Sequence, residues 1–263
     1  MIPKVSSCFV ENFFHYLINR GFFSYGNDYG FRAFGRFTIE HFIWLFAIAV
    51  VIIVITSKYL RLDNTDRAVM DKIIGNSLLF LIVIRIAVIC ILGKMTVYEL
   101  PLHLCSMGGI LCVLFTYYRW EWTAQVLYNL CLPGTVCALI FPDWSFYPAI
   151  HFITIQAFLF HGGLVLYVLC QLVSGKIKPD IKKIWMVFAF LGIIVPIVYY
   201  IDVRYDVNFM FVRRPSPGSP LSWLADITGE KGYLTGYAVL VLGVIIIMNI
   251  IFNFLNKHKM IIK

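Results

Sequence analysis

The stretch with the strongest chemical character is Glu99–Gly109, which reads ELPLHLCSMGG. It places His103 two residues before Cys105, after a proline of the kind that is tolerated at a helix start. Both side chains then fall in the first turns of a predicted helix, where the positive helix end stabilises a thiolate. They lie about 200° apart around the helix, so they do not face one small pocket. A nucleophilic Cys105 would therefore need a base from another segment.

Two histidines in a later apolar segment could supply that base, because a neighbouring imidazole activates a thiol. We predict Cys105 as nucleophile, His161 or His151 as its base, and His103 as a further catalytic candidate. Each has a simpler alternative role. A free cysteine packs as a small hydrophobic residue, and a helical histidine can bond a nearby backbone carbonyl.

Polar side chains inside apolar segments are costly, and they are therefore candidates for function. We predict substrate contacts for Arg85, Asn129, His151, Gln156, Arg213 and Arg214. The alternatives are snorkelling, interhelical hydrogen bonds and solvated loop charges. We expect no carboxylate deep in a span, which disfavours a proton or sodium pump. The last apolar segment also lacks the lysine that a retinal Schiff base requires.

The composition is that of a membrane protein. Of the 263 residues, 60% are hydrophobic and 14% are charged, whereas soluble domains average about 45–50% and about 25%. The net charge of +8 comes from Lys and Arg clusters between apolar runs. This pattern is typical of cytoplasmic loops and predicts no nucleic-acid binding. The seven cysteines form no CxxC motif, which argues against a redox or zinc site, and we expect neither metal nor cofactor.

Apolar runs of the length that spans a bilayer occur about seven times. They are residues 39–57, 73–93, 98–118, 122–141, 147–173, 184–201 and 233–255. We predict an all-α membrane protein with a single bundle over 39–256, an N-terminal arm over 1–38 and a basic tail over 257–263. Within the arm, residues 9–20 place apolar side chains on one helical face, which predicts an amphipathic helix on the membrane surface.

Loop charge and helix signals refine this arrangement. Lys and Arg favour the side that holds the C-terminus, which predicts a plasma-membrane protein with its N-terminus outside and its C-terminus in the cytoplasm. At about 1.5 Å per residue, most of the polar candidates fall in the outer half of the bilayer. This predicts a cavity open to the outer leaflet or the outer water. Ser219 before Pro220 predicts a short helix over its mouth.

Four sequence features carry a family resemblance. LPLHLCSMGG, the FPD element at 141–143, the pair His161-Gly162 and the loop NFMFVRRPSPGSPL resemble the YwaF-type bacterial integral membrane proteins. The resemblance runs from about residue 35 to about residue 255. These proteins are distantly similar to an animal family of transmembrane acyltransferases that make polyunsaturated ether phospholipids, in which a membrane-embedded cysteine after Asn-Pro is the proposed nucleophile. The resemblance implies Cys105 as nucleophile and His161 as base, although Leu-His-Leu replaces the residues before the cysteine.

Together these observations predict a lipid acyltransferase or hydrolase that uses a cysteine and a histidine within the membrane. Its partners would be membrane lipids, with a phospholipid or another acyl lipid as substrate. Two alternatives stay open. One is a transporter or sensor of a small amphipathic or anionic ligand, and the other is a structural subunit of a membrane complex.

Overall fold

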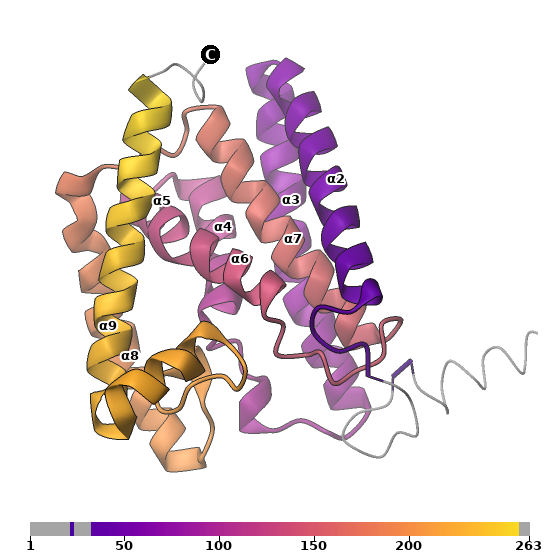
Figure 1. The fold of residues 1–263 in the computed structure, drawn as a ribbon. Helices are drawn as coiled ribbons and strands as arrows, with labels where there is room; N and C mark the ends of the chain where they lie inside the picture. Colours follow the sequence, from indigo (N-terminus) through magenta and orange to yellow (C-terminus); the bar gives the residue numbers. More distant parts are fainter. Residues whose placement is uncertain (1–21, 24–32, 258–263) are drawn as a thin grey trace, which may run out of the picture.

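A computed structural model of the chain describes residues 22–23 and 33–257 (Figure 1). The predicted surface helix over 9–20 and most of the basic tail lie outside these residues. The α-helices are α2 (Ile39–Arg61), α3 (Asn64–Ile91), α4 (Leu104–Tyr118), α5 (Glu121–Val126), α6 (Leu132–Ile140), α7 (Phe152–Val173), α8 (Ile184–Tyr205) and α9 (Pro220–Lys257). Short helical turns are η1 (Val97–Glu99), η3 (Ile181–Lys183) and η4 (Phe209–Phe211), and η2 (Leu127–Cys131) is a π-helical turn between α5 and α6.

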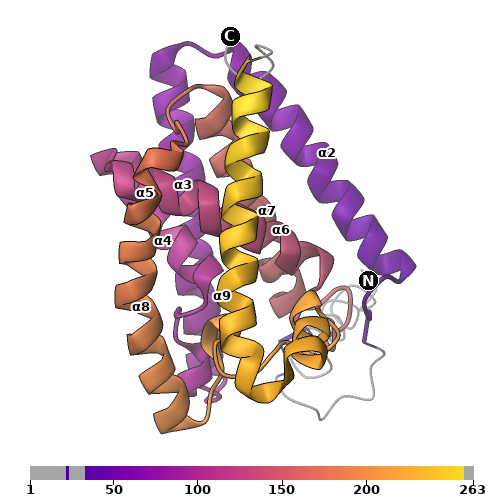
Figure 2. The same ribbon diagram turned by 60° about the vertical axis from the view of Figure 1, so that its left-hand side comes forward.

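The predicted class, a helical membrane bundle, is confirmed. Six helical segments are long and apolar enough to cross a membrane, with α5, η2 and α6 forming one of them, and α4 is a shorter apolar helix. The described residues contain no strand. The segment α5–η2–α6 and α7 are mostly buried, whereas α2, α3, α8 and α9 bury few side chains. The outer helices thus surround two central ones, as Figures 1 and 2 show.

The chain alternates between two ends of this bundle. One end, here called the pocket end, holds residues 33–38, 92–103, 141–151 and 206–219. The far end holds the links after α2, α4 and α7. In the predicted orientation the pocket end would face outward.

Several predicted boundaries need correction. The third span, expected over 98–118, is α-helical only from Leu104, because Pro101 cannot donate a helical hydrogen bond and disfavours the helical conformation before it. The fifth span begins at Phe152 rather than 147. The short helix expected after Ser219 is present, and the Leu221 amide donates to its hydroxyl at 3.2 Å. That helix is the start of α9, which breaks at Gly229, where φ is +70°.

A buried carboxylate joins four segments at the far end. Asp71 of α3 accepts hydrogen bonds from Tyr59, Gln171, Arg119 and Lys176, with the two cations at 2.8 and 2.7 Å. Its carboxylate is therefore paired on all sides and links α2, α3, the end of α4 and the link after α7.

Three acids are buried, although none lies deep in a predicted span. Asp71, Glu99 and Asp202 are all buried. Each lies within a few residues of a helix end. Neighbouring helices and loops bury these ends, which a count of apolar residues along one segment does not capture. The sequence argument against a pump concerned carboxylates deep in a span, and it stays a prediction.

The π-helical turn holds α9 against the bundle. Asn249 of α9 donates to the side-chain oxygen of Asn129 at 2.6 Å, and the Tyr128 hydroxyl donates to the Met248 carbonyl at 2.8 Å. A π-turn shifts the helical register by one residue, and such turns are frequent at functional sites. Here the turn directs two consecutive polar side chains toward α9.

We predict that Asp71→Ala lowers the free energy of unfolding by roughly 2–3 kcal/mol, because hydrogen bonds to a charged group contribute about 1.5–3 kcal/mol each. The two cations are partly exposed and can recover some hydration, which limits the loss. Denaturant unfolding in lipid–detergent micelles measures it. The exposed Asp226→Ala is the matched control. An equal effect of both substitutions would contradict the structural role of Asp71.

Candidate functional site

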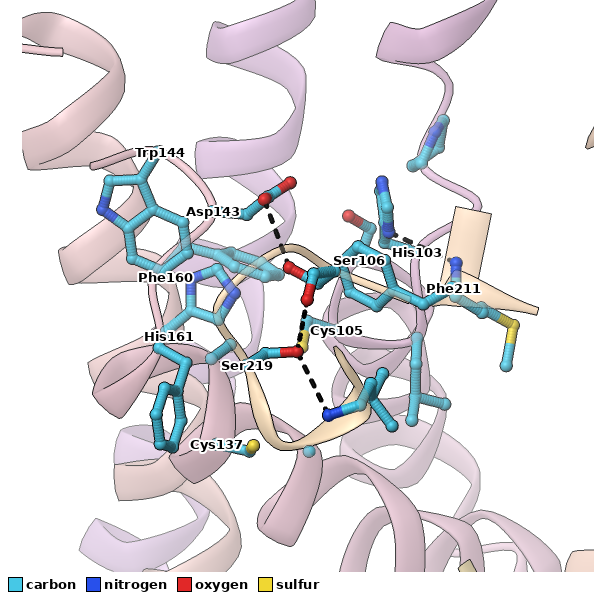
Figure 3. Close-up of a pocket in the computed structure, with 18 of the residues that line it drawn as sticks. His103, Cys105, Ser106, Cys137, Asp143, Trp144, Phe160, His161, Phe211 and Ser219 are labelled. Carbon is cyan, nitrogen blue, oxygen red and sulfur yellow. Dashed lines mark hydrogen bonds between the residues drawn. The ribbon is translucent and has the colours of Figure 1, made fainter. Parts of the chain in front are cut away.

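A cavity of about 370 Å³ opens at the pocket end, a volume within the range of small-molecule sites. Its walls come from α3, α4, the segment η2–α6, α7 and α9, and from the loops of the pocket end. Most of the lining is apolar. Figure 3 shows part of this lining, with Cys105, His161 and Ser219 around the same space.

The structure brings together most of the side chains predicted from the sequence. Those that line the cavity are Cys105, His161, His103, Arg85, Asn129 and Gln156. Apart from His103 and Cys105, they come from segments far apart in the chain. The expectation that these two do not face one small pocket is wrong, because His103 precedes α4 in extended backbone and helical spacing does not apply to it. His151, Arg213 and Arg214 do not line it. Their roles in catalysis or binding stay predictions.

Cys105 is the second residue of α4 and is half-buried because it faces the cavity. Thr135 of α6 donates its hydroxyl to the cysteine sulfur at 3.6 Å. No hydrogen bond within the described part of the chain joins this sulfur to a histidine. The Thr135 hydroxyl is fully buried, and its only acceptor there is the sulfur. The sequence analysis missed Thr135, because a threonine in an apolar helix carries no signal of its own.

His161 of α7 has a defined tautomer. Its Nδ1–H donates to the Ala157 carbonyl at 2.7 Å, and since a carbonyl only accepts, the proton must lie on Nδ1. The Nε2 atom of the neutral ring then carries a free lone pair. Trp144 stacks on the imidazole with ring centroids 4.7 Å apart. The backbone bond expected as the simpler role of His161 is thus present, and it leaves the other ring nitrogen available as a base.

His103 has the opposite tautomer. It precedes α4, and its Nδ1 accepts a hydrogen bond from the Met210 amide at 3.4 Å. The neutral ring therefore carries its proton on Nε2. Phe209 packs edge-on against the imidazole. The cavity thus holds one histidine able to accept a proton and one able to donate a hydrogen bond.

Arg85 and Gln156 contribute polar groups from α3 and α7. Arg85 forms a 3.0 Å ion pair with the buried carboxylate of Glu99. Gln156 donates its amide to the Leu81 carbonyl at 3.1 Å, while its oxygen is buried and has no hydrogen-bond partner among the described residues. An unpaired buried acceptor beside a cavity suits the hydroxyl or N–H of an occupant.

Asn129 and His151 have partners within the protein. The Asn129 amide donates to the Gln125 carbonyl at 2.9 Å, in addition to its bond with Asn249. His151 precedes α7, where its Nδ1 accepts from the Ile153 amide at 3.1 Å. Asn129 therefore satisfies a carbonyl of its own distorted helix, and His151 caps α7.

Arg213 and Arg214 lie in the loop before α9, where both donate to Asp206 at 2.8 and 3.2 Å. The hydrogen bond from Arg213 lowers the pKa of the Asp206 carboxyl below its usual range. Arg213 also donates to the Asp202 carbonyl at 2.8 Å. The two guanidinium groups therefore hold this loop together.

The aspartate of the FPD element joins the loops around the mouth of the cavity. Ser216 and Tyr98 both donate to the Asp143 carboxylate, at 3.4 and 3.5 Å. Arg36 donates to the carbonyls of Pro142 and Pro217, at 3.1 and 2.5 Å. The four segments of the pocket end are thereby held together, and Asp143 lies above Cys105 in Figure 3.

These features define a multi-pass helical membrane protein with an amphipathic cavity at one end of the bundle. In the described residues, no group of three or more His, Cys, Asp or Glu side chains could hold a metal ion. The model of the TMEM164 family matches residues 36–255. The chain therefore belongs to the TMEM164 family, and the match supports this family rather than the YwaF-type proteins in particular. Neither curated proteins nor solved structures gave a significant match.

We predict that Thr135→Val slows alkylation of Cys105 at a given pH, because a hydroxyl donor stabilises a thiolate more than a thiol. Thr135→Ser, which keeps the hydroxyl, should preserve the rate. Peptide mass spectrometry after timed exposure to a membrane-permeant maleimide resolves Cys105 from the other cysteines. Thr154→Val, which removes a buried hydroxyl bonded to the Pro148 carbonyl, is the control. Equal rates in Thr135→Val and wild type would contradict the contact.

Proposed function

We propose that this protein is a membrane-embedded lipid acyltransferase or hydrolase with Cys105 as nucleophile and His161 as base. One observation carries the proposal: both residues line a single cavity with apolar walls and a charged mouth. Such a space suits a lipid ester, whose acyl chain is apolar and whose headgroup is polar. The resemblance described above assigns the same two residues these roles.

The tautomers support separate roles for the two histidines. His161 has its free lone pair on Nε2, which is the state that a general base requires. His103 has its proton on Nε2 and can donate to an oxygen that gains charge. The backbone N–H groups of the first turn of α4 also lack helical partners. Cys105 lies in that turn, so these groups could stabilise an oxyanion beside its sulfur.

The reaction would proceed in two steps. His161 takes the thiol proton as the Cys105 sulfur attacks the ester carbonyl carbon, and the oxygen becomes an oxyanion. The carbon–oxygen ester bond then breaks, His161 protonates the leaving alkoxide, and a thioester remains. In the second step a hydroxyl of an acceptor, or water, attacks the thioester while His161 takes its proton. The carbon–sulfur bond breaks, and the thiolate regains that proton.

One specific observation favours a second candidate, the binding of a small amphipathic ligand without chemistry. The Cys105 sulfur bonds to Thr135 and, within the described chain, not to a histidine. Catalytic contacts are often long in unliganded enzymes and tighten when substrate binds, so the observation does not exclude an acyl-transfer role. Ligand binding that survives Cys105→Ser, without turnover in the wild type, would support this second candidate.

The test is turnover of a diacyl phospholipid with a labelled acyl chain, in phosphatidylcholine vesicles that contain the purified protein. Transfer to a lysophospholipid and release of free fatty acid are measured together. Cys105→Ala should abolish both, and His161→Ala should lower the rate by about 10²–10⁴-fold, the usual contribution of a general base. A labelled acyl group on the Cys105 peptide, trapped without acceptor, would identify the thioester.

Cys90→Ala is the matched control, since Cys90 of α3 is a free, exposed cysteine that does not line the cavity. It should keep wild-type turnover. Turnover by Cys105→Ala, or equal losses in both cysteine variants, would overturn the assignment.

A further inference from the structure

The wall of the cavity between α6 and α9 reaches the outer surface of the bundle. Cys137 of α6 and Leu240 of α9 both line the cavity, and both side chains are exposed, Leu240 by 38%. Helix α9 packs mainly on η2 rather than on α6. The cavity therefore has an opening in the side of the bundle, in addition to its mouth among the loops.

Hydrogen bonds fix α9 above and below this opening. On the pocket-end side, Tyr233 and Tyr237 donate their hydroxyls to the carbonyls of Phe211 and Met210, at 2.7 and 3.2 Å. On the far side, the Asn249 bond to η2 holds the helix. Apart from the Tyr128 bond to the Met248 carbonyl beside the far anchor, no hydrogen bond among the described residues joins another segment to the roughly 18 Å of helix between these anchors. The opening is thus bounded at both ends by hydrogen bonds that hold α9.

The opening between α6 and α9 is apolar, whereas the mouth of the cavity among the loops is charged. Its lining consists of Cys137, Ala138, Leu240, Val241 and Val244. The adjacent outer face of α9 exposes further apolar side chains, such as Val239 and Leu242, as expected of a surface that faces hydrocarbon. The charged pair Arg85–Glu99 lies at the other side of the cavity.

We infer that the opening between α6 and α9 is a lateral portal through which one acyl chain of a membrane lipid enters the cavity from the bilayer. The chain would pass between Cys137 and Leu240 and lie along Val241 and Val244. The polar end of the lipid would then face the side of the cavity that holds Arg85. The inference adds a route of substrate entry to the proposed function. It rests on that function only for the reaction that follows entry.

The occupant follows from the surroundings of the portal. In the membrane, the medium next to exposed apolar helices consists of acyl chains, and the portal offers no charged group to a hydrophilic ligand. An ordered helix is about 10–12 Å across with its side chains and would take up most of the roughly 18 Å between the anchors, whereas an acyl chain is much thinner. We therefore assign the portal to a lipid chain rather than to a partner helix.

Photo-crosslinking tests the portal without turnover, in a Cys105→Ala background. The protein is placed in phosphatidylcholine vesicles with a small fraction of phosphatidylcholine that carries a diazirine at mid-chain. After illumination, mass spectrometry locates the adducts. We expect adducts on Leu130, a cavity-lining residue that is only 5% exposed and lies out of reach of the lipid outside the bundle. A headgroup diazirine should not label it.

Leu240→Trp fills the portal and should reduce the Leu130 adduct severalfold. Val239→Trp is the matched control, because Val239 is the adjacent residue on α9, is 64% exposed and does not line the cavity. It should leave the adduct unchanged. Both sites are exposed, and unchanged melting of both variants checks that they fold.

Three outcomes would overturn the portal: a Leu130 adduct that Leu240→Trp does not reduce, equal labelling by the headgroup probe, or a protein–protein crosslink at α9. Labelling that depends on Leu240, combined with a wild type that turns over no lipid, would leave the portal valid and overturn only the proposed chemistry.

Discussion

Hydrocarbon cannot satisfy a polar group, and the rest of this structure depends on that constraint. Every hydrogen-bonding side chain in the bundle must find a partner inside the protein. At the far end, Asp71 gathers four donors and thereby joins four segments of the chain. At the pocket end, the same constraint is met differently, since polar side chains line a cavity. At the far end the polar side chains pair with one another, whereas at the pocket end some of them can bind an occupant of the cavity.

The π-helical turn between α5 and α6 lies between these two ends. Asn129 satisfies a carbonyl of its own distorted helix, accepts from Asn249 of α9 and also lines the cavity. Its neighbour Tyr128 makes a second bond to α9. The turn therefore holds α9 in position, and α9 forms part of the cavity wall. A register shift of one residue thus contributes to the shape of the site.

The sequence predicted the helical bundle, because hydropathy fixes the spans. It offered His161 or His151 as the partner of Cys105, and the family resemblance selected His161. It could not predict the contact of Thr135 with Cys105, since the depth of a residue in the membrane does not determine which neighbouring helix it faces. It also missed Asp71, which precedes the apolar part of α3 and reads as a surface charge until α7 covers it. Partners across helices depend on packing and rotation, which a single sequence encodes only indirectly.

The separation of Cys105 and His161 has a consequence for substrate. The sulfur is held by Thr135, and the Nδ1 of His161 is held by a backbone carbonyl. Each group is therefore oriented by a different helix, α4 with α6 on one side and α7 on the other. An ester lying between them would be the element that completes the contact. Without the ester, no hydrogen bond in the described part of the chain joins the thiol to a base, so the thiol would not react with water alone. A lipid that reaches the cavity would bring the thiol and the base together.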